Sequence, residues 1–140
     1  YNAGNSFVMA STGSMSDNDT TSRTSDRGGR QAEDLAAHFL EKQRLKIVTR
    51  NYRCRGGEID LVCRDGKVLV FVEVRLRRNA AYGGAAASVT PTKQRRIILA
   101  AQHYLMTHSL ANSDCRFDCV LLNDVSANHI EWLRDAFTLD

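Results

Sequence analysis

The sequence predicts an α/β domain in which a mixed β-sheet is flanked by helices, in the order αβββαβ(β). Residues 30–45 and 90–108 repeat apolar side chains at helical spacing, whereas the segments between and after them have strand-like patterns. The length of 140 residues and the 43% hydrophobic content suit one packed domain. No apolar run approaches the roughly 20 residues that span a membrane. No secretory signal is evident either, so we expect a cytoplasmic protein without a membrane partner.

The first predicted helix covers residues 30–45, where one apolar stripe repeats at the spacing of a buried helix face. Glu33 lies beside this stripe, near the helix start. The stripe consists of Ala32, Leu35, Ala36, Phe39 and Leu40. Residues 1–29 are rich in Ser, Thr, Asn, Asp and Gly and have no apolar period. We therefore predict a flexible tail over 1–29, with added sequence ahead of Met15, and a domain over 30–140.

Three strands are predicted next, over residues 47–53, 58–64 and 67–77. Gly56-Gly57 separates the first two, and Asp65-Gly66 between the second and third is a strong signal for a two-residue hairpin turn. Apolar residues alternate along the second and third strands and are expected to share one face of the hairpin. They are Ile59, Leu61, Cys63, Val68, Val70, Val72, Val74 and Leu76.

The second predicted helix begins with Thr90 as its N-cap and Pro91 at its first position, and it runs to about residue 108. The N-cap oxygen can satisfy a free backbone N–H, and proline lacks the N–H that would be unpaired there. The remaining predicted elements are a loop over 79–88, a strand over 116–122 and a short strand or edge segment over 130–137.

The cysteines do not form a metal-binding pattern. Cys54, Cys63, Cys115 and Cys119 include no C-x-x-C pair, and no histidine is placed to complete a zinc site. We interpret them as reduced thiols in or near the core. Asp118, in the strand over 116–122, is likewise expected to be structural and paired with an arginine.

Positive charge is concentrated in the middle of the chain. The net charge is only +3, but residues 42–96 contain 14 Lys or Arg against four acids, Glu58, Asp60, Asp65 and Glu73. This asymmetry favours a polyanionic partner, with nucleic acid as the leading candidate. From charge alone, a generically basic solvated surface is an equally good interpretation.

The predicted hairpin gathers acidic side chains on one face. If Asp65-Gly66 forms the turn, Glu58 lies opposite Glu73, and Asp60 is a diagonal neighbour of Glu73 with Cβ atoms roughly 7 Å apart or less. Arg75 shares this polar face, and the opposite face is the apolar one. Glu73 interrupts an otherwise very apolar strand, so its charge needs a physical reason.

Clustered carboxylates require a compensating charge. Arg75 can supply one, and a hard divalent cation is the other natural answer, because Mg²⁺ takes one or two carboxylates together with water and phosphate oxygens. A solvated polar face carrying salt bridges is the alternative, since strands with alternating charges are common. The pattern alone leaves both interpretations open.

Two motifs carry a family resemblance, Gly57-Glu58-Ile59-Asp60-Leu61 and Phe71-Val72-Glu73-Val74-Arg75. With them the chain resembles the bacterial YraN family, a group of proposed endonucleases in the PD-(D/E)xK nuclease superfamily that is similar in fold to archaeal Holliday-junction resolvases. The resemblance covers about residues 29–122. Its other matching positions are Gly29, Ala32-Glu33, Arg50-Asn51-Tyr52-Arg53, Tyr82-Gly83, Lys93, Tyr104-Leu105 and Arg116-Phe117-Asp118.

The resemblance implies a restriction-endonuclease-like core and roles for individual residues. Asp60 corresponds to the metal-binding aspartate of the superfamily, and Glu73 to the acid of its E-x-K element. Arg75 stands where that element usually has lysine. Because arginine stays charged, it can stabilise phosphate charge but cannot act as a base. Glu33 matches an acidic position on the first helix that can reach the metal, and Arg77 is a second candidate for the cationic role.

We therefore expect a DNA endonuclease dependent on Mg²⁺ or Mn²⁺, acting on branched or recombination intermediates. The expected metal ligands are Asp60, Glu73 and Glu58. The expected contacts to DNA are Arg53, Arg55, Arg77, Lys93 and Arg96. Two alternatives stay open: a non-catalytic nucleic-acid-binding module on the same fold, and a partner-binding protein with a solvated acidic face. A homodimer is expected only by analogy with junction-cutting enzymes, which make two symmetric cuts.

Overall fold

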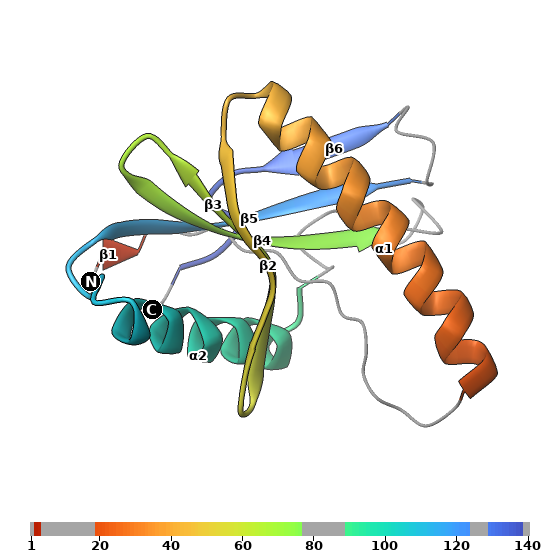
Figure 1. The fold of residues 1–140 in the computed structure, drawn as a ribbon, viewed down its shortest axis with the longest axis horizontal. Helices are drawn as coiled ribbons and strands as arrows, with labels where there is room; N and C mark the ends of the chain where they lie inside the picture. The colour runs from red at the N-terminus through yellow and green to blue at the C-terminus, as the bar shows by residue number, and fades with distance from the viewer. Residues whose placement is uncertain (1, 4–18, 77–88, 124–128, 139–140) are drawn as a thin grey trace.

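The computed structural model describes residues 2–3, 19–76, 89–123 and 129–138, with side chains from residue 29 onward. Its elements are β1 (Asn2–Ala3), α1 (Asp19–Lys42), β2 (Lys46–Cys54), β3 (Gly57–Asp65), β4 (Val68–Leu76), α2 (Pro91–Thr107), β5 (Asp114–Leu122) and β6 (Ile130–Leu133). The predicted α/β class and element order are confirmed, with β1 in addition (Figure 1). No helix in this part of the chain is long and apolar enough to cross a membrane.

The sheet is mixed and has the strand order β1-β5-β4-β3-β2, with β6 paired to β5. β4 and β5 are parallel, whereas the β2–β3, β3–β4 and β5–β6 pairs are antiparallel. The connection between the parallel strands contains α2, which begins as predicted with Thr90 as its N-cap and Pro91 in its first turn. The hydroxyl oxygen of Thr90 accepts a hydrogen bond from the backbone N–H of Lys93 at 3.2 Å. The predicted loop over 79–88 lies outside the described residues.

Helix α1 begins at Asp19, well before the predicted start at residue 30. Residues 19–29, which the sequence assigned to a tail, carry no apolar stripe, so the pattern could not place them in a helix. A helix that is nucleated by packing can extend into polar sequence, because adding a turn costs much less than starting one. The packed part is the predicted one, with Ala32, Ala36 and Leu40 buried.

Both faces of the sheet are buried, each under one helix. Leu40 of α1 packs with Leu61 and Val72, whereas Ile97 of α2 packs with Phe71 on the other face. The prediction that one face of the hairpin is polar is therefore wrong. The parallel β4–β5 pair is covered on both sides, as parallel strands usually are. The four cysteines are free thiols, and Cys63, Cys115 and Cys119 are buried, as predicted.

The β3–β4 turn also differs from the prediction. Asp65 pairs with Val68, so the two turn residues are Gly66 and Lys67 rather than Asp65 and Gly66. Gly66 has a φ of 64°, and neither Asp65 nor Lys67 has a positive φ. A positive φ at the first turn position alone is typical of a type II′ turn, which favours glycine there. The observed register differs from the predicted one by two residues, and a difference of two does not by itself move a side chain to the other face.

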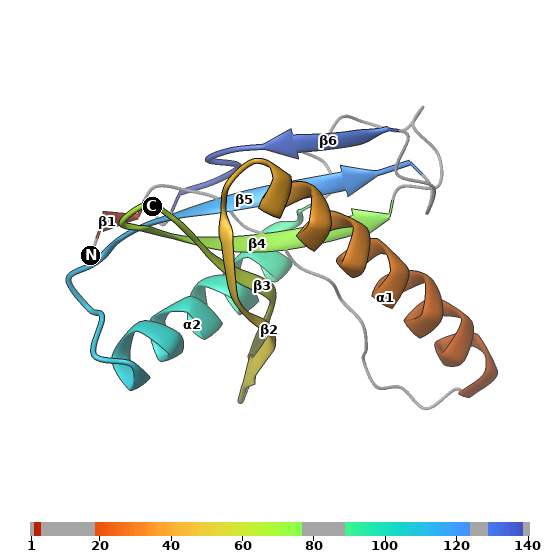
Figure 2. The same ribbon diagram turned by 45° about the horizontal axis from the view of Figure 1, so that its top comes forward.

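The β2–β3 ribbon changes face along its length. Ile59 and its partner Tyr52 belong to the cluster under α2, whereas Leu61 belongs to the cluster under α1. Strict alternation would place residues 59 and 61 on one face, as the sequence predicted, so that part of the prediction is wrong. The change falls between them, where Asn51 of β2 has a left-handed φ of 53°. Figure 2 shows this end of the ribbon leaving β4.

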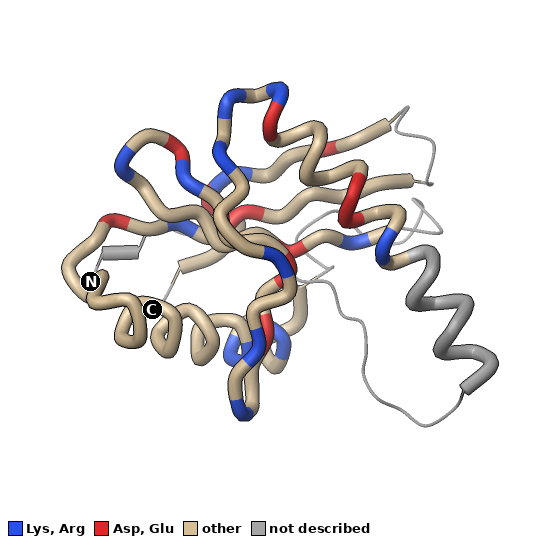
Figure 3. The backbone as a smooth tube through the Cα atoms, in the orientation of Figure 1, with Lys and Arg blue, Asp and Glu red and all other residues tan. Residues whose placement is uncertain are grey.

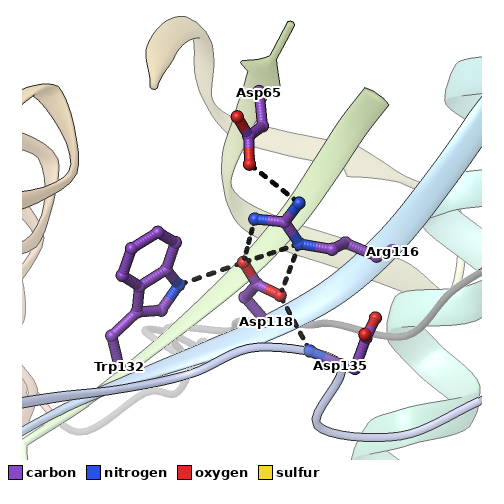
Figure 4. Close-up of polar contacts among 5 residues, drawn as sticks. All are labelled: Asp65, Arg116, Asp118, Trp132 and Asp135. Atoms are coloured by element: carbon purple, nitrogen blue, oxygen red, sulfur yellow. Dashed lines mark hydrogen bonds and ion pairs between the residues drawn. The ribbon is translucent and has the colours of Figure 1, made fainter. Parts of the chain in front are cut away.

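Asp118 is structural, as predicted. It is buried in β5, and Arg116 donates to both of its carboxylate oxygens at 3.1 to 3.3 Å (Figure 4). The indole N–H of Trp132 and the backbone N–H of Asp135 each donate to it at 3.0 Å. Arg116 also contacts Asp65 at 2.9 Å. These contacts fasten β5 to β6 and to the β3–β4 turn.

Candidate metal site

Asp60 and Glu73 lie in the interior of the protein. Their exposed fractions are 1% and 0%. The β3–β4 pairing ends at Leu61 and Val72, so these two acids occupy the next position, where β3 leaves β4. They interact electrostatically across this junction. The two acids are thus neighbours, each one residue beyond the last β3–β4 pair, and the predicted register in which they were diagonal is wrong.

Most of their carboxylate oxygens lack a hydrogen-bond partner. The backbone N–H of Val74 donates to Oδ2 of Asp60 at 2.9 Å. Oδ1 of Asp60 and both carboxylate oxygens of Glu73 are buried with no hydrogen bond to any described residue. Nη1 of Arg75 approaches Oε2 of Glu73, but only to 3.9 Å. Buried polar atoms are nearly always satisfied, so three such atoms in one place indicate a missing partner.

Burial raises the pKa of Asp60 well above its usual value, and the neighbouring Glu73 raises it further. Burial likewise raises the pKa of Glu73, while the nearby charges of Arg75 and Lys93 lower it in part. Two carboxylates this close and this buried cannot both stay charged without a cation between or beside them. The pair therefore retains protons or has its charge balanced by a cation, which can be a side chain of the protein or a bound ion.

The residues present fit a hard divalent cation. The unsatisfied atoms are carboxylate oxygens, which are the ligands that Mg²⁺ and Mn²⁺ prefer. Among the residues that the structure describes, no three His, Cys, Asp or Glu side chains form a ready-made cage. Mg²⁺ does not need one, because it is commonly held by one or two carboxylates together with waters and substrate phosphates.

Two further acids border the pair. Glu33 of α1 is 5% exposed, and Nδ2 of Asn51 donates to its Oε1 at 3.1 Å. Glu58 is half-buried at the start of β3, where Nε of Arg53 lies 3.9 Å from its Oε1. Burial raises the pKa of both carboxyls, and both raise the pKa of Asp60. The structure thus gathers all four predicted acids around one region.

Lys93, which the sequence assigned to DNA contact, lies beside the acids. It occupies the first turn of α2 and is half-buried. Burial lowers the pKa of its ammonium group and Arg75 lowers it further, while Glu73 and Asp60 raise it. The site therefore has two cations of its own chain, a guanidinium from β4 and an ammonium from α2.

Basic side chains surround the turn between β2 and β3. Figure 3 shows Lys and Arg at this turn and at the start of α2. The two segments touch, since a Cβ at Gly57 would lie 2.3 Å from the carbonyl oxygen of Arg96. Arg53, Arg55 and Arg96 are exposed, and we call these three the basic rim. The predicted contact Arg77 lies outside the described residues.

Comparison with known proteins identifies the family. A family model described as the uncharacterised protein family UPF0102 matches residues 32–122. The chain belongs to this family.

The resemblance to the YraN family is thereby confirmed, because UPF0102 is that family. A UPF0102 protein of Dechloromonas aromatica is 55% identical over 88% of this chain and 95% of its own length. Relatives in Saccharophagus degradans and Cupriavidus taiwanensis are 55% and 56% identical, each over 80% of this chain, and over 93% and 83% of their own lengths. The UPF0102 match includes the four acids, Arg75 and Lys93.

The sequence assigned Lys93 to DNA contact without placing it beside the acids, and it gave no role to Asn51. The pattern did show one signal for Lys93, because a cation in the first turn of a helix opposes the helix dipole and therefore needs a reason. Asn51 gave no such signal. Its left-handed backbone and its bond to Glu33 depend on the packing of β2 against α1, which periodicity does not reveal.

Proposed function

We propose that this member of the UPF0102 family is an endonuclease that hydrolyses DNA phosphodiesters with Mg²⁺ or Mn²⁺ as its cation. The observation that carries the proposal is the set of three buried, unsatisfied oxygens on Asp60 and Glu73. A structural role would not leave them unpaired, because an unsatisfied buried polar group destabilises a fold by about 1–3 kcal/mol.

Each charged group then has a chemical role. Asp60 and Glu73 hold the cation, with Glu33 and Glu58 assisting through it or its water. When bound, such an ion lowers the pKa of a coordinated water and neutralises charge on the phosphodiester. Arg75, which stays charged, stabilises the developing phosphate charge. Lys93 supplies the compact ammonium that the E-x-R element lacks.

The basic rim supports DNA as the substrate. Arg53, Arg55 and Arg96 are exposed on the side of Glu58, where both Arg53 and Arg96 lower the pKa of that carboxyl. Phosphate oxygens bound there would pass close to the buried acids. We further propose branched DNA as the preferred substrate and a homodimer as the active form, since two symmetric cuts require two sites.

The basic rim makes a testable contribution to DNA affinity. Replacing Arg55 with alanine is expected to weaken binding about equally on all DNA sequences. It should also reduce the slope of log affinity against log salt concentration by about one, because one phosphate contact is lost. Fluorescence anisotropy over a salt series measures this slope. Lys42→Ala, at the exposed end of α1 and outside the rim, is the matched control. An unchanged slope for Arg55→Ala would show that Arg55 does not contact a DNA phosphate.

A cleavage assay tests the function itself. Linear, nicked and four-way-junction DNA are incubated with Mg²⁺ or Mn²⁺ and with wild type, Glu73→Ala, or Glu41→Ala, which removes an exposed acid of α1. We expect metal-dependent product from wild type and Glu41→Ala, and none from Glu73→Ala. DNA binding without product from any substrate would favour the non-catalytic module, a role compatible with Arg75 in the lysine position.

A further inference from the structure

Asn51 has an unusual backbone conformation for its place in the fold. Its φ is 53°, and among the described residues it is the only non-glycine residue inside a strand with a positive φ. This conformation disfavours side chains with a Cβ, although Asn tolerates it better than most. Such residues persist only where the surrounding structure enforces them, and they cluster at functional sites.

Asn51 of β2 and Asp60 of β3 lie between two partnered positions of the β2–β3 ribbon, Arg50 with Leu61 and Tyr52 with Ile59. On one side of this position Leu61 packs under α1, and on the other side Ile59 packs under α2. The left-handed residue thus coincides with the turn that takes β3 away from β4. At this point Asp60 directs Oδ2 to the backbone N–H of Val74 and leaves Oδ1 unsatisfied.

The side chain of Asn51 reaches the other neighbour of Asp60. Its Nδ2 donates to Oε1 of Glu33 at 3.1 Å, and Glu33 is almost fully buried although it lies on a helix. Glu33 in turn acts electrostatically on Asp60. One residue is therefore linked to two acids of the site, through its backbone to Asp60 and through its amide to Glu33.

A second link between β2 and α1, which makes no hydrogen bond to the buried acids, is present one residue away. Nη1 of Arg50 lies 2.6 Å from Oδ1 of Asp34, and both side chains are exposed. The Arg50–Asp34 pair joins the same two elements through two exposed side chains, whereas Asn51, although exposed itself, donates to the buried carboxylate of Glu33. The two links can therefore be separated by substitution.

We propose that Asn51 is a positioning residue of the metal site. Its left-handed backbone sets the direction of Asp60, and its amide fixes the Glu33 carboxylate beside Asp60, where Glu33 acts on the cation through its charge or through a bound water. The inference rests on the proposed function insofar as it requires a cation at Asp60 and Glu73.

Mn²⁺ binding measured by calorimetry tests the amide. Asn51→Gly removes the amide and keeps the backbone conformation, which glycine adopts freely. We expect Asn51→Gly and Glu33→Gln each to weaken Mn²⁺ binding about 10–100-fold, as is usual when a residue that orients a metal ligand is lost. The double variant should be no weaker than the worse single variant, because both changes break one interaction. Arg50→Ala should weaken Mn²⁺ binding much less than Asn51→Gly does, because Arg50 acts on Glu33 only through its charge and not through a hydrogen bond.

Asn51→Ala tests the backbone. Alanine lacks the amide and also disfavours positive φ, so it should bind Mn²⁺ more weakly than Asn51→Gly does. Equal Mn²⁺ affinities of Asn51→Gly and Asn51→Ala would show that the backbone conformation of residue 51 does not contribute to metal binding.

The possible failures can be told apart. Wild-type affinity in Asn51→Gly, or an equal loss in Arg50→Ala, would overturn the positioning role and leave the metal site intact. No Mn²⁺ binding by the wild type would overturn this inference together with the metal-dependent function.

Discussion

Glu73→Gln is expected to make the metal-free protein more stable than wild type at neutral pH and to abolish its stabilisation by Mg²⁺. The buried carboxyl of Glu73 has a pKa raised above 4.5, with no hydrogen bond from any described residue to satisfy its charged form. Glutamine has nearly the same shape and never takes that charge. The expected gain is on the order of 1 kcal/mol, because glutamine avoids the cost of either burying a charge or keeping the acid protonated, and it corresponds to several degrees in Tm.

The gain should depend on pH in a defined direction. Below 4.5 the carboxyl is protonated in both the folded and the unfolded chain, so wild type and variant should have similar stability. As the pH rises, the unfolded chain ionises first, and wild-type stability is lost progressively up to the raised folded-state pKa. The advantage of Glu73→Gln should therefore grow over this range and then level off.

Thermal unfolding in EDTA and in Mg²⁺, over a pH series, measures both effects. Mg²⁺ should raise the Tm of wild type, because it binds only the folded state, and should leave Glu73→Gln unchanged. Glu41→Gln, an exposed carboxyl on α1, is the matched control and should follow wild type throughout. A variant less stable than wild type at every pH in EDTA would show that the protein already compensates the charge of Glu73, and the argument for a cation would be lost.

Lys93→Met should lower the rate of DNA cleavage by roughly 10²–10³-fold while DNA affinity changes little. This is the usual cost of removing one positively charged or donor group that stabilises the transition state. Methionine keeps an unbranched side chain of similar reach in the half-buried position. Mn²⁺ affinity should be equal to or above that of wild type, because a positive charge that competes with the ion has been removed.

The control for Lys93 is Arg95→Met, in the same helical turn. Arg95 is exposed and donates to the hydroxyl of Thr92 at 3.2 Å, away from the acids. Single-turnover rates and anisotropy separate catalysis from binding. If Lys93→Met lowers only the DNA affinity and its salt dependence, and not the cleavage rate, Lys93 is a phosphate contact, as the sequence predicted, and has no catalytic role.

The architecture followed from local patterns. Thr90 and Pro91 marked the start of α2, and the apolar stripe marked the packed part of α1, because capping and periodicity are determined by neighbouring residues. The prediction that Asp60 and Glu73 are neighbours holds although the predicted turn was wrong. A register shift of two residues does not by itself move a side chain to the other face.

The surroundings of the acids could not be predicted in the same way. That both sides of β4 are buried depends on how two helices pack on the sheet, and the position of Lys93 depends on a contact between α2 and β4. The left-handed backbone of Asn51 depends on the β2–β3 ribbon and on Glu33 together. These are long-range features, and local alternation contains no information about them.

The position of β2 has a consequence for how the protein behaves at high concentration. Within the described residues β2 is an edge strand of the sheet, so its outer backbone groups are available to pair with another strand. Lys46, Arg50 and Arg53 are exposed along it. Antiparallel addition of a second β2 would bring these positive charges together. The charges that suit β2 to a polyanion thereby also protect its open edge against fibrous aggregation.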